Sequence, residues 1–219
     1  MEWRVTDSRV YGMRPAFGGR GCQRYAGPMP EAHEQTPYLV GQLLLSMPGI
    51  GDARFERAVI AICVHDGEGA LGIMANRAHD GLGVRALMMQ LDLDPGVTPD
   101  VPVLIGGPVE PGRGFVLHTN DYAGQSTIMV GGSDLALTST LDVLKDIAAG
   151  TGPRQWLAAL GYTGWAAGQL DTELTRHGWH SIDGDPALLF ETPLEARWPR
   201  AFGTLGIDVG HLSANAGRA

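Results

Sequence analysis

Residues 57–76 read RAVIAICVHDGEGALGIMAN, and this stretch decides the fold. Residues 58–64 are apolar without interruption, and β-branched side chains are frequent among them, a pattern typical of a strand that is covered on both faces. The turn DGEG follows at 66–69, and a second apolar run leads to residue 76. Two such runs joined by a short glycine-containing turn predict a β-hairpin at the centre of a sheet.

The first half of the chain continues as short apolar runs separated by glycine and proline turns. We expect further strands at 39–47, 101–106, 114–119 and 126–130. A helix is predicted for 82–91, because its apolar residues recur at helical spacing.

The second half of the chain reads mainly as helices. Apolar spacing and capping signals predict helices at 139–150, 153–161 and 166–176, with short strands at 179–182 and 187–190. A final helix is expected to begin with Thr192 as N-cap, because Pro193 and Glu195 follow at its first and third positions. This order of strands and helices, without strict alternation, predicts an α+β fold with a mixed, largely antiparallel sheet and helices packed around it.

Residues 1–37 carry no sustained apolar periodicity, and breaker pairs such as Gly18-Gly19 and Gly27-Pro28 interrupt them. We therefore expect a poorly ordered N-terminal leader. The remaining residues, 38–219, fit a single domain with a sizeable core, since 44% of the chain is hydrophobic.

Charge is unevenly distributed along the chain, whose net charge is −8. Residues 1–30 hold five Arg against one Glu and one Asp and so carry +3, which leaves −11 for residues 31–219. An acidic body repels phosphate groups and gains little from the release of counterions. Direct DNA binding and attraction to an anionic membrane are therefore not expected.

The two cysteines are Cys22 in the leader and Cys63 in the long apolar run. A domain of this size does not need a disulfide, so a reduced, cytoplasmic protein is the simpler interpretation. The longest apolar run, 58–64, is far too short to span a bilayer.

Motifs of familiar enzyme chemistry are missing from the sequence: it has no nucleophile elbow, no P-loop and no dinucleotide-binding glycine pattern. Cys63 lies among Ile and Val, where burial makes a thiol unreactive. The spacing of Cys63 and His65 places them on one strand face, yet two ligands are too few for a zinc site. We predict no catalytic residues, no metal and no cofactor, and the sequence leans against an enzyme.

Two places could still hold a small ligand. The first is the loop 106–114, where Gly106 and Gly107 would allow a close backbone approach, Arg113 could bind an anion, and His118 follows. The alternative for this loop is a rigid wide turn, which its two prolines favour.

The second place is the end of the hairpin, where Asn76 and Arg77 follow one strand and Arg57 precedes the other. Charged residues at the end of a sheet often line a cleft. A salt-bridged surface is the more common outcome.

Several motifs resemble those of the AlgH/YqgE-type family of uncharacterised bacterial proteins. The sequence SMPGIGDARFERAV at 46–59 is similar to the family's opening motif M-P-x-x-x-D-x-x-F-x-R-S/A-V, and EGALGIMANR at 68–77 is similar to its hairpin. GGPV at 106–109 and GYTGW at 161–165, followed by GQL at 168–170, match its later signatures. The likeness runs from residue 39 to residue 217, nearly the whole body.

The resemblance implies a mixed sheet bent into a partial barrel with helices packed outside. Some family members carry a transcriptional-regulator label, but the resemblance brings no catalytic residue or cofactor to this chain. Its signature residues read as structural, with Trp165 in the core and Asn76 in a hydrogen bond at a strand end.

Three functions stay open, and the sequence favours the first, a non-enzymatic regulatory or adaptor protein that acts through contacts with an unidentified protein partner. The second is a small-ligand binder or enzyme that uses the loop 106–114 together with Asn76 and Arg77. The third is a transcriptional regulator that binds DNA directly, which the acidic body disfavours.

Overall fold

The structure is a computed structural model that describes residues 5–6, 9–10, 38–176 and 178–211. Strands β1 (Val5–Thr6) and β2 (Arg9–Val10) pair antiparallel as a separate two-stranded sheet. The rest of the predicted leader lies outside the described residues, so its expected lack of order stays a prediction.

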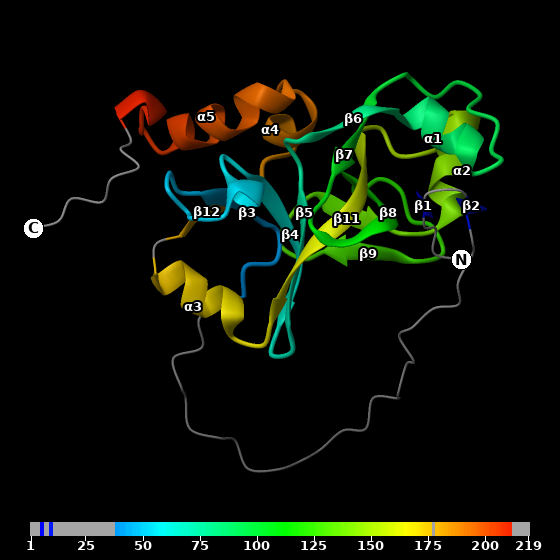
Figure 1. Ribbon diagram of the computed structural model, residues 1–219. Coiled ribbons are helices and arrows are strands. Elements are labelled where there is room, and N and C mark those ends of the chain that lie inside the picture. The colour runs from blue at the N-terminus through cyan, green and yellow to red at the C-terminus, as the bar shows by residue number, and fades with distance from the viewer. Residues whose placement is uncertain (1–4, 7–8, 11–37, 177, 212–219) are drawn as a thin grey trace, which may run out of the picture.

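One sheet of ten strands forms the body of the molecule. In chain order its strands are β3 (Gln42–Ser46), β4 (Val59–Asp66), β5 (Gly69–Met74), β6 (Ala78–Gly83), β7 (Pro102–Ile105), β8 (Val109–Thr119), β9 (Thr127–Val130), β10 (Leu135–Thr138), β11 (Trp156–Ala166) and β12 (Trp179–Asp183). Neighbouring strands follow the order β12-β3-β4-β5-β11-β8-β10-β9, while β7 pairs with β6 and, in parallel, with β11. The other pairs are antiparallel, and the sheet curls into a half-barrel, which confirms the predicted α+β fold (Figure 1).

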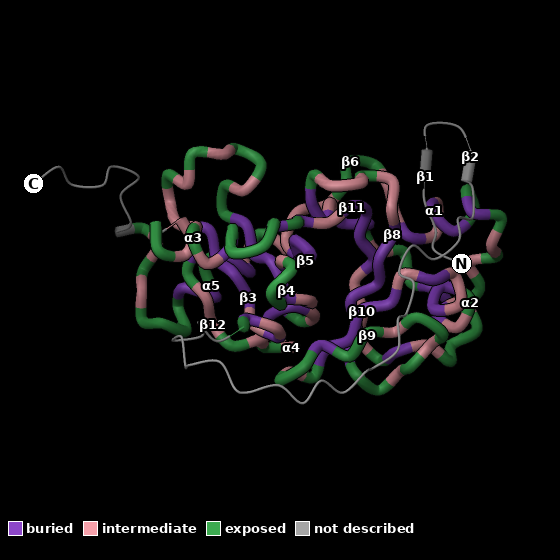
Figure 2. Tube along the Cα trace, turned by 90° about the horizontal axis from the view of Figure 1, so that it is seen from below, coloured by how far each residue is buried: buried purple, intermediate pink, exposed green. Residues whose placement is uncertain are grey.

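The described residues form five α-helices, which lie on the outside of the sheet (Figures 1 and 2). They are α1 (Val84–Gln90), α2 (Leu141–Ala149), α3 (Gln169–Thr175), α4 (Pro186–Phe190) and α5 (Leu194–Thr204). Helices α1 and α2 lie together at one end of the molecule, and α3, α4 and α5 surround the other end. Within the part of the chain that the structure describes, none of these helices has the length and apolar character needed to cross a bilayer.

Three apolar clusters join the helices to the sheet. The first fills the space between the sheet and helices α4 and α5, and the fully buried Phe202 of α5 belongs to it. The second packs α1 and α2 against β8 and β11, and the third packs α3 against β3, β4 and β5. Strand β4 sends alternate residues into the first and third clusters, so both its faces are buried, as predicted for a central strand.

The β4–β5 hairpin forms where the sequence predicts it, but with an irregularity. A β-bulge between Ile62 and Val64 shifts the register and reverses the alternation of side chains beyond it. Cys63 packs in the first cluster, whereas the ring of His65 accepts a hydrogen bond from the Leu39 N–H at 3.0 Å on the side that α3 covers. The prediction that Cys63 and His65 share one strand face is therefore wrong.

The predicted helix at 153–161 is wrong as well, because most of this segment belongs to β11. Its larger apolar residues fit a helical spacing, but Ala158 and Ala159 are only 1% and 0% exposed, so the run is buried on both faces. Periodicity does not separate a short buried strand from a buried helix in such a case. Strand β11 pairs with β8 along one edge and with β5 and β7 along the other, which places it at the centre of the sheet.

The predicted strand at 187–190 is also wrong, since these residues lie in α4. Asp185 caps this helix by accepting a hydrogen bond from the Ala187 N–H at 2.9 Å, and a proline occupies the next position. Helix α5 follows Pro193, one residue later than a cap at Thr192 would place it. The Thr192 hydroxyl instead donates to the Ala187 carbonyl at 3.3 Å and ties the start of α5 to α4.

Candidate functional site

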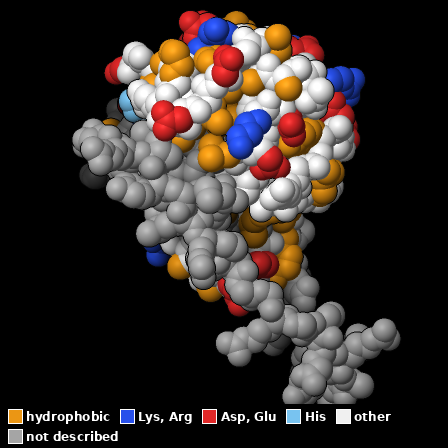
Figure 3. Space-filling model, turned by 90° about the vertical axis from the view of Figure 1, so that its right-hand side faces the viewer, with side chains coloured by type: hydrophobic (Ala, Val, Ile, Leu, Met, Phe, Trp, Pro, Cys, Tyr) orange, Lys and Arg blue, Asp and Glu red, His pale blue; other side chains and the backbone are white. Residues whose placement is uncertain are grey.

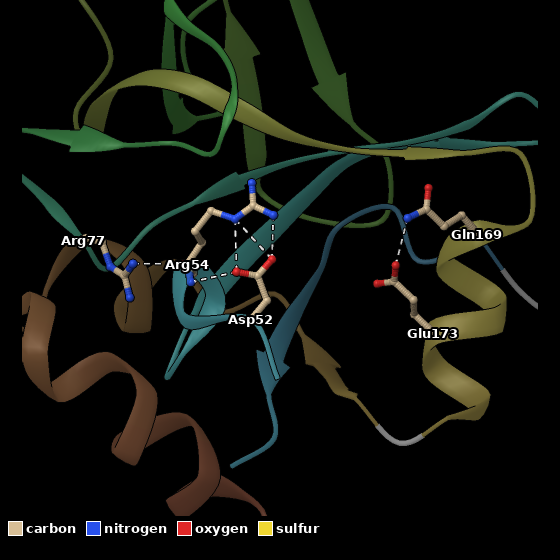
Figure 4. A network of polar contacts seen from close by, with 5 residues as sticks. All are labelled: Asp52, Arg54, Arg77, Gln169 and Glu173. Carbon is tan, nitrogen blue, oxygen red and sulfur yellow. Dashed lines mark hydrogen bonds and ion pairs between the residues drawn. The ribbon is translucent and has the colours of Figure 1, made fainter. Parts of the chain in front are cut away.

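Residues 48–57, which connect β3 to β4 and which we call the groove loop, lie beside two cavities. The groove loop opens with the turn sequence PGIG at 48–51 and ends in a single 3-10 turn, Ala53–Phe55. The Asp52 carboxylate starts that turn by accepting hydrogen bonds from the Arg54 N–H at 2.9 Å and from the Arg54 guanidinium, whose nearest nitrogen is 2.7 Å away (Figure 4). These bonds to Arg54 hold the pKa of the Asp52 carboxyl below its ordinary value.

Asn76, two residues after the end of β5, holds the end of the groove loop. Its Oδ1 accepts a hydrogen bond from the Val59 N–H at 2.9 Å, and its Nδ2–H donates to the Arg57 carbonyl at 2.7 Å. The predicted hydrogen bond of Asn76 at a strand end is thus confirmed. It fixes the backbone of Arg57, which is left-handed with φ of 53°.

Arg77 holds the middle of the groove loop (Figure 4). Its guanidinium donates to the Arg54 carbonyl at 2.9 Å and to the Glu56 carbonyl at 3.1 Å. Both acceptors are backbone atoms, so Arg77 shapes the loop, and it forms no ion pair with a carboxylate of the described residues.

Arg57 is an exposed cation of the groove loop, as is Arg54, whose guanidinium binds Asp52. The Arg57 guanidinium lies over the ring of Trp198 in α5, 5.8 Å from the ring centroid. Among the described residues, no carboxylate lies within ion-pair distance of it. A left-handed backbone is costly for a residue other than glycine and is most common at functional sites. Arg57 is therefore the predicted residue best placed to meet a ligand or a partner.

The two cavities share part of the groove loop. The first has a volume of about 1080 Å³ and extends from the groove loop to Asn76, Arg77 and α5, where Glu195 and Trp198 line it. The second has a volume of about 920 Å³ and extends from the groove loop to α3 and to residues 108–109. Four residues line both cavities: Pro48, Gly49, Ile50 and Asp52. The groove loop thus forms a ridge between two hollows, each large enough for a small ligand or for peptide side chains.

An aromatic wall backs the second cavity. Trp165 and Trp179 are each 6% exposed, and both indole N–H groups donate to Oε2 of Glu173 at 2.9 Å. Gln169 donates to the other oxygen of the same carboxylate at 2.9 Å (Figure 4) and accepts from the Ala166 N–H at 3.0 Å. Glu173 therefore joins α3 to β11 and β12. The sequence reasoning missed this role, and its one local signal is the spacing of Gln169 and Glu173 by one helical turn.

The predicted loop 106–114 is in large part a strand, because β8 begins at Val109, and Gly106 and Gly107 just before it pack against β11. A Cβ atom added to Gly106 would lie 2.2 Å from the Gly161 carbonyl oxygen, and one added to Gly107 would lie 2.2 Å from the backbone carbon of Tyr162. The backbone of β11 therefore occupies the space that the missing side chains of Gly106 and Gly107 leave. Of this loop, residues 108–109 line the second cavity.

Arg113 and His118 line neither of the two cavities beside the groove loop. The Arg113 guanidinium lies 3.6 Å from the Glu110 carboxylate and 5.1 Å from the centroid of the Phe115 ring, while His118 is fully buried in β8. Of the seven predicted ligand-binding residues, three line the first cavity: Arg57, Asn76 and Arg77.

His118 belongs to a buried chain of hydrogen bonds. Its Nδ1–H donates to the Thr119 carbonyl at 2.7 Å, and its Nε2 accepts from the Thr138 hydroxyl at 2.9 Å. The Thr138 oxygen lies 2.7 Å from the Thr127 hydroxyl, which accepts from the Gly124 N–H at 2.7 Å. Burial lowers the pKa of His118 below its ordinary value, which favours the neutral ring that this chain requires. Both ring nitrogens are occupied by the protein.

Reactive groups are scarce in the described part of the chain. Cys63 is 2% exposed, and burial raises the pKa of its thiol to about 12, which leaves it unreactive. No group of three or more His, Cys, Asp or Glu side chains among the described residues is placed to hold a metal ion.

Comparison with known proteins shows the same architecture elsewhere. Residues 43–210 match the AlgH-like family. The chain belongs to this family. UPF0301 proteins of Novosphingobium aromaticivorans and Rhodospirillum rubrum are 49% and 50% identical to it, over 84% and 83% of this chain and 99% and 95% of theirs.

Two solved structures are similar to this AlgH-like chain. The solution structure of AlgH from Pseudomonas aeruginosa is 38% identical and aligns over 87% of this chain and 100% of that one, with a TM-score of 0.68. A crystal structure of a Corynebacterium diphtheriae protein is 19% identical, covers 74% of this chain and 84% of that one, and shares the fold with a TM-score of 0.61.

The motifs that resemble the AlgH-like signatures converge on the groove loop. The opening motif contains this loop, and the hairpin motif supplies Asn76 and Arg77, which hold it. The motif at 106–109 borders the second cavity, and the late motif supplies Trp165 and Gln169 of its wall. The signature residues of the AlgH-like fold thus build one surface.

Proposed function

We propose that this AlgH-like chain is a non-enzymatic regulatory or adaptor protein that binds a protein partner through the groove loop and the two cavities beside it. The observation that carries this proposal is that the polar side chains around the groove loop form hydrogen bonds to the protein itself. Asn76 and Arg77 bind the loop backbone, and Glu173 binds two indole groups. These hydrogen bonds hold the groove loop and the wall of the second cavity in place, and the Arg57 side chain remains exposed on this surface. A shaped surface without an activated nucleophile suits recognition better than catalysis.

The lining of the groove supports a protein partner. Trp and Arg often dominate the binding energy of protein interfaces. Trp198 and Arg57 line the first cavity, and Trp165 and Trp179 line the second. A partner that places one side chain on each side of the groove loop would use both hollows at once.

Charge argues against nucleic acid and membrane as partners. On the described part of the face that carries α1 and α2, acidic and basic side chains are interspersed and no continuous basic patch is present (Figure 3). Residues 31–219 carry −11, so counterion release from DNA would add little affinity. We place the protein in the cytoplasm. Thiols stay reduced there, and a chain of this size with only two cysteines needs no disulfide.

Photo-crosslinking in living cells tests the proposed surface. A photoreactive amino acid replaces Glu56, which is exposed and lines the first cavity. The matched control replaces Glu68, an exposed residue in the β4–β5 turn that lines neither cavity. We expect one protein adduct from position 56 and none from position 68. No protein adduct at position 56, or the same adducts at both positions, would contradict the proposal.

Binding of a small ligand in the first cavity is the second candidate function, and the exposed Arg57 guanidinium favours it. Residues 106–114 do not line this first cavity, and Gly106 and Gly107 pack against β11. A ligand at 100 times its dissociation constant would stabilise the protein by about 2.7 kcal/mol. A thermal-shift screen of nucleotides, acyl-CoAs and sugar phosphates distinguishes the two functions: a protein-binding module shows no shift, whereas a ligand site shows one that Arg57→Gln removes.

A further inference from the structure

The second cavity, between the groove loop and α3, has apolar and aromatic side chains in much of its lining. Trp165 and Trp179 form its buried wall. Other apolar side chains of the lining are only half-buried, so part of their surface remains accessible: Met47, Ile50, Phe55 and Val109. Clefts that bind ligands typically combine such apolar walls with a few polar groups. The cavity therefore offers apolar surface that a binding partner can cover.

Three aromatic rings of this cavity pack edge to face. The centroids of Phe55 and Trp179 lie 5.6 Å apart with an interplanar angle of 69°, and those of Trp165 and Trp179 lie 6.2 Å apart at 79°. Aromatic rings attract each other in this arrangement. Both indole groups are held by Glu173 and are buried, whereas Phe55 is only half-buried. A ring from a partner that packs against Phe55 would extend the series.

The charged side chains around the second cavity are bound to other groups of the protein, with the exception of Arg176. Asp52 binds Arg54 on the groove loop, and Gln169 binds Glu173 on α3 (Figure 4). Arg176 is exposed at the end of α3, and no carboxylate of the described residues lies within ion-pair distance of it. A guanidinium can bind a carboxylate through two parallel hydrogen bonds. This cavity thus combines apolar surface with one cation that suits a carboxylate.

We propose that the second cavity binds a segment of a protein partner in which an aromatic residue lies next to Asp or Glu. The aromatic side chain packs against Phe55 and the half-buried apolar side chains, and the neighbouring carboxylate pairs with Arg176. This inference rests on the proposed function, because it names the chemistry of the partner that the groove loop binds.

Selection from a phage-displayed library of random peptides, with the full chain as the target, tests this chemistry. We expect the enriched peptides to share an aromatic residue next to Asp or Glu. A synthetic copy of one enriched peptide should then shift the NMR signals of the Trp165 and Trp179 indole N–H groups. The indole N–H of Trp198, which lines the first cavity and donates to the Ser46 carbonyl, should shift less.

Three charge variants locate the carboxylate of the bound peptide. Arg176→Gln should raise the dissociation constant of the peptide about tenfold. Arg200→Gln loses the same charge at an exposed position outside both cavities and should leave binding unchanged. Arg57→Gln removes the exposed cation of the first cavity and should also leave it unchanged. When the acidic residue of the peptide is replaced by its amide, Arg176→Gln should no longer have an effect.

Phe55→Leu tests the aromatic contact, because it keeps an apolar side chain but removes the ring. We expect it to weaken peptide binding about threefold. Arg176 is exposed, so its replacement provides the test even if Phe55→Leu fails to fold.

The inference and the proposed function fail in different ways. A library that enriches no such motif would overturn the inference, and so would a peptide that Arg176→Gln binds as tightly as the unmodified chain does. Binding that depends on Arg57 and not on Arg176 would also overturn it, yet would leave the proposed function in place. The proposed function fails separately, when position 56 crosslinks to no protein in cells.

Discussion

The loop 106–114 and the groove loop 48–57 have similar compositions, yet the structure uses them in opposite ways. Both contain glycine, proline and charged residues. In the first, Gly106 lies so close to Gly161 that no side chain fits between the two backbones. In the second, a Cβ atom on Gly51 would have no atom within 4 Å.

This difference shows what a glycine in a sequence does and does not indicate. Glycine marks a place where the backbone needs freedom or space. Whether a neighbouring strand or an open cavity occupies that space depends on residues far away in the chain. For the loop 106–114 that neighbour is β11, which the sequence predicts in part as a helix.

The sharpest test of the comparison replaces one glycine in each loop. Gly106→Ala forces a methyl group into the Gly161 carbonyl and should lower the free energy of unfolding by about 3 kcal/mol or more. Gly51→Ala has free space but a φ of +85°, so its cost should be about 1–2 kcal/mol. Urea denaturation of both variants measures the difference. Equal costs, or a larger cost at Gly51, would break the comparison.

A second test removes the residue that holds the groove loop. Asn76→Ala loses the hydrogen bonds to Val59 and Arg57, which should lower the free energy of unfolding by about 1–3 kcal/mol. Amide hydrogen exchange should also become faster at Val59. Asn120→Ala, which loses an exposed 3.2 Å contact to Asp134, is the control and should change stability by about 0.5 kcal/mol or less. If the two variants are equally stable, Asn76 does not hold the loop.

A third test concerns His118, on the side of the loop 106–114. Its pKa is lowered by burial in the folded protein, while the unfolded chain titrates near 6.5. Below that pH the unfolded chain binds the proton more readily, so protonation favours unfolding. The contribution of His118 to stability should be complete above pH 6.5 and should be lost as the pH falls toward its lowered pKa.

Urea denaturation at several pH values measures this effect of His118. In His118→Gln the loss of stability just below pH 6.5 should become smaller than in the unmodified protein. An unchanged pH profile in His118→Gln would show that the ring is not held neutral.

The smallest expected effect on stability is that of Arg57. Arg57→Gln removes only the contact with the Trp198 ring, so it should lower the free energy of unfolding by about 0.5–1 kcal/mol. Arg200→Gln, at an exposed position of α5 outside both cavities, should change it by about 0.5 kcal/mol or less. Thermal melting of both variants checks this. A large loss in Arg57→Gln would mean that Arg57 is a structural residue and not an exposed contact.

The elements that the sequence predicts well are those whose signal is local. The β4–β5 hairpin has two apolar runs and a glycine turn, and Asn76 stands where a strand end needs a hydrogen bond. The first half of β11 is buried on both faces at residues 158–161, so its apolar spacing carries no information about its geometry. Strands β6 and β10 are short and are not predicted from the sequence.

In the candidate site, too, the sequence predicts only the residues that local structure brings together. Arg57, Asn76 and Arg77 lie near each other because one hairpin connects them, and the sequence places them together. Trp198 and Glu173 join the site only through the packing of α5 and α3. Apart from the one-turn spacing of Gln169 and Glu173, no local pattern indicates that packing.

The affinity of the crosslinked partner for three proteins tests most directly whether the groove loop is a recognition surface. Isothermal titration calorimetry compares the unmodified chain with Arg57→Gln and Arg200→Gln, two variants that lose the same charge. We expect binding about tenfold or more weaker for Arg57→Gln and unchanged for Arg200→Gln. Equal affinity in all three proteins would contradict a recognition role for the groove loop.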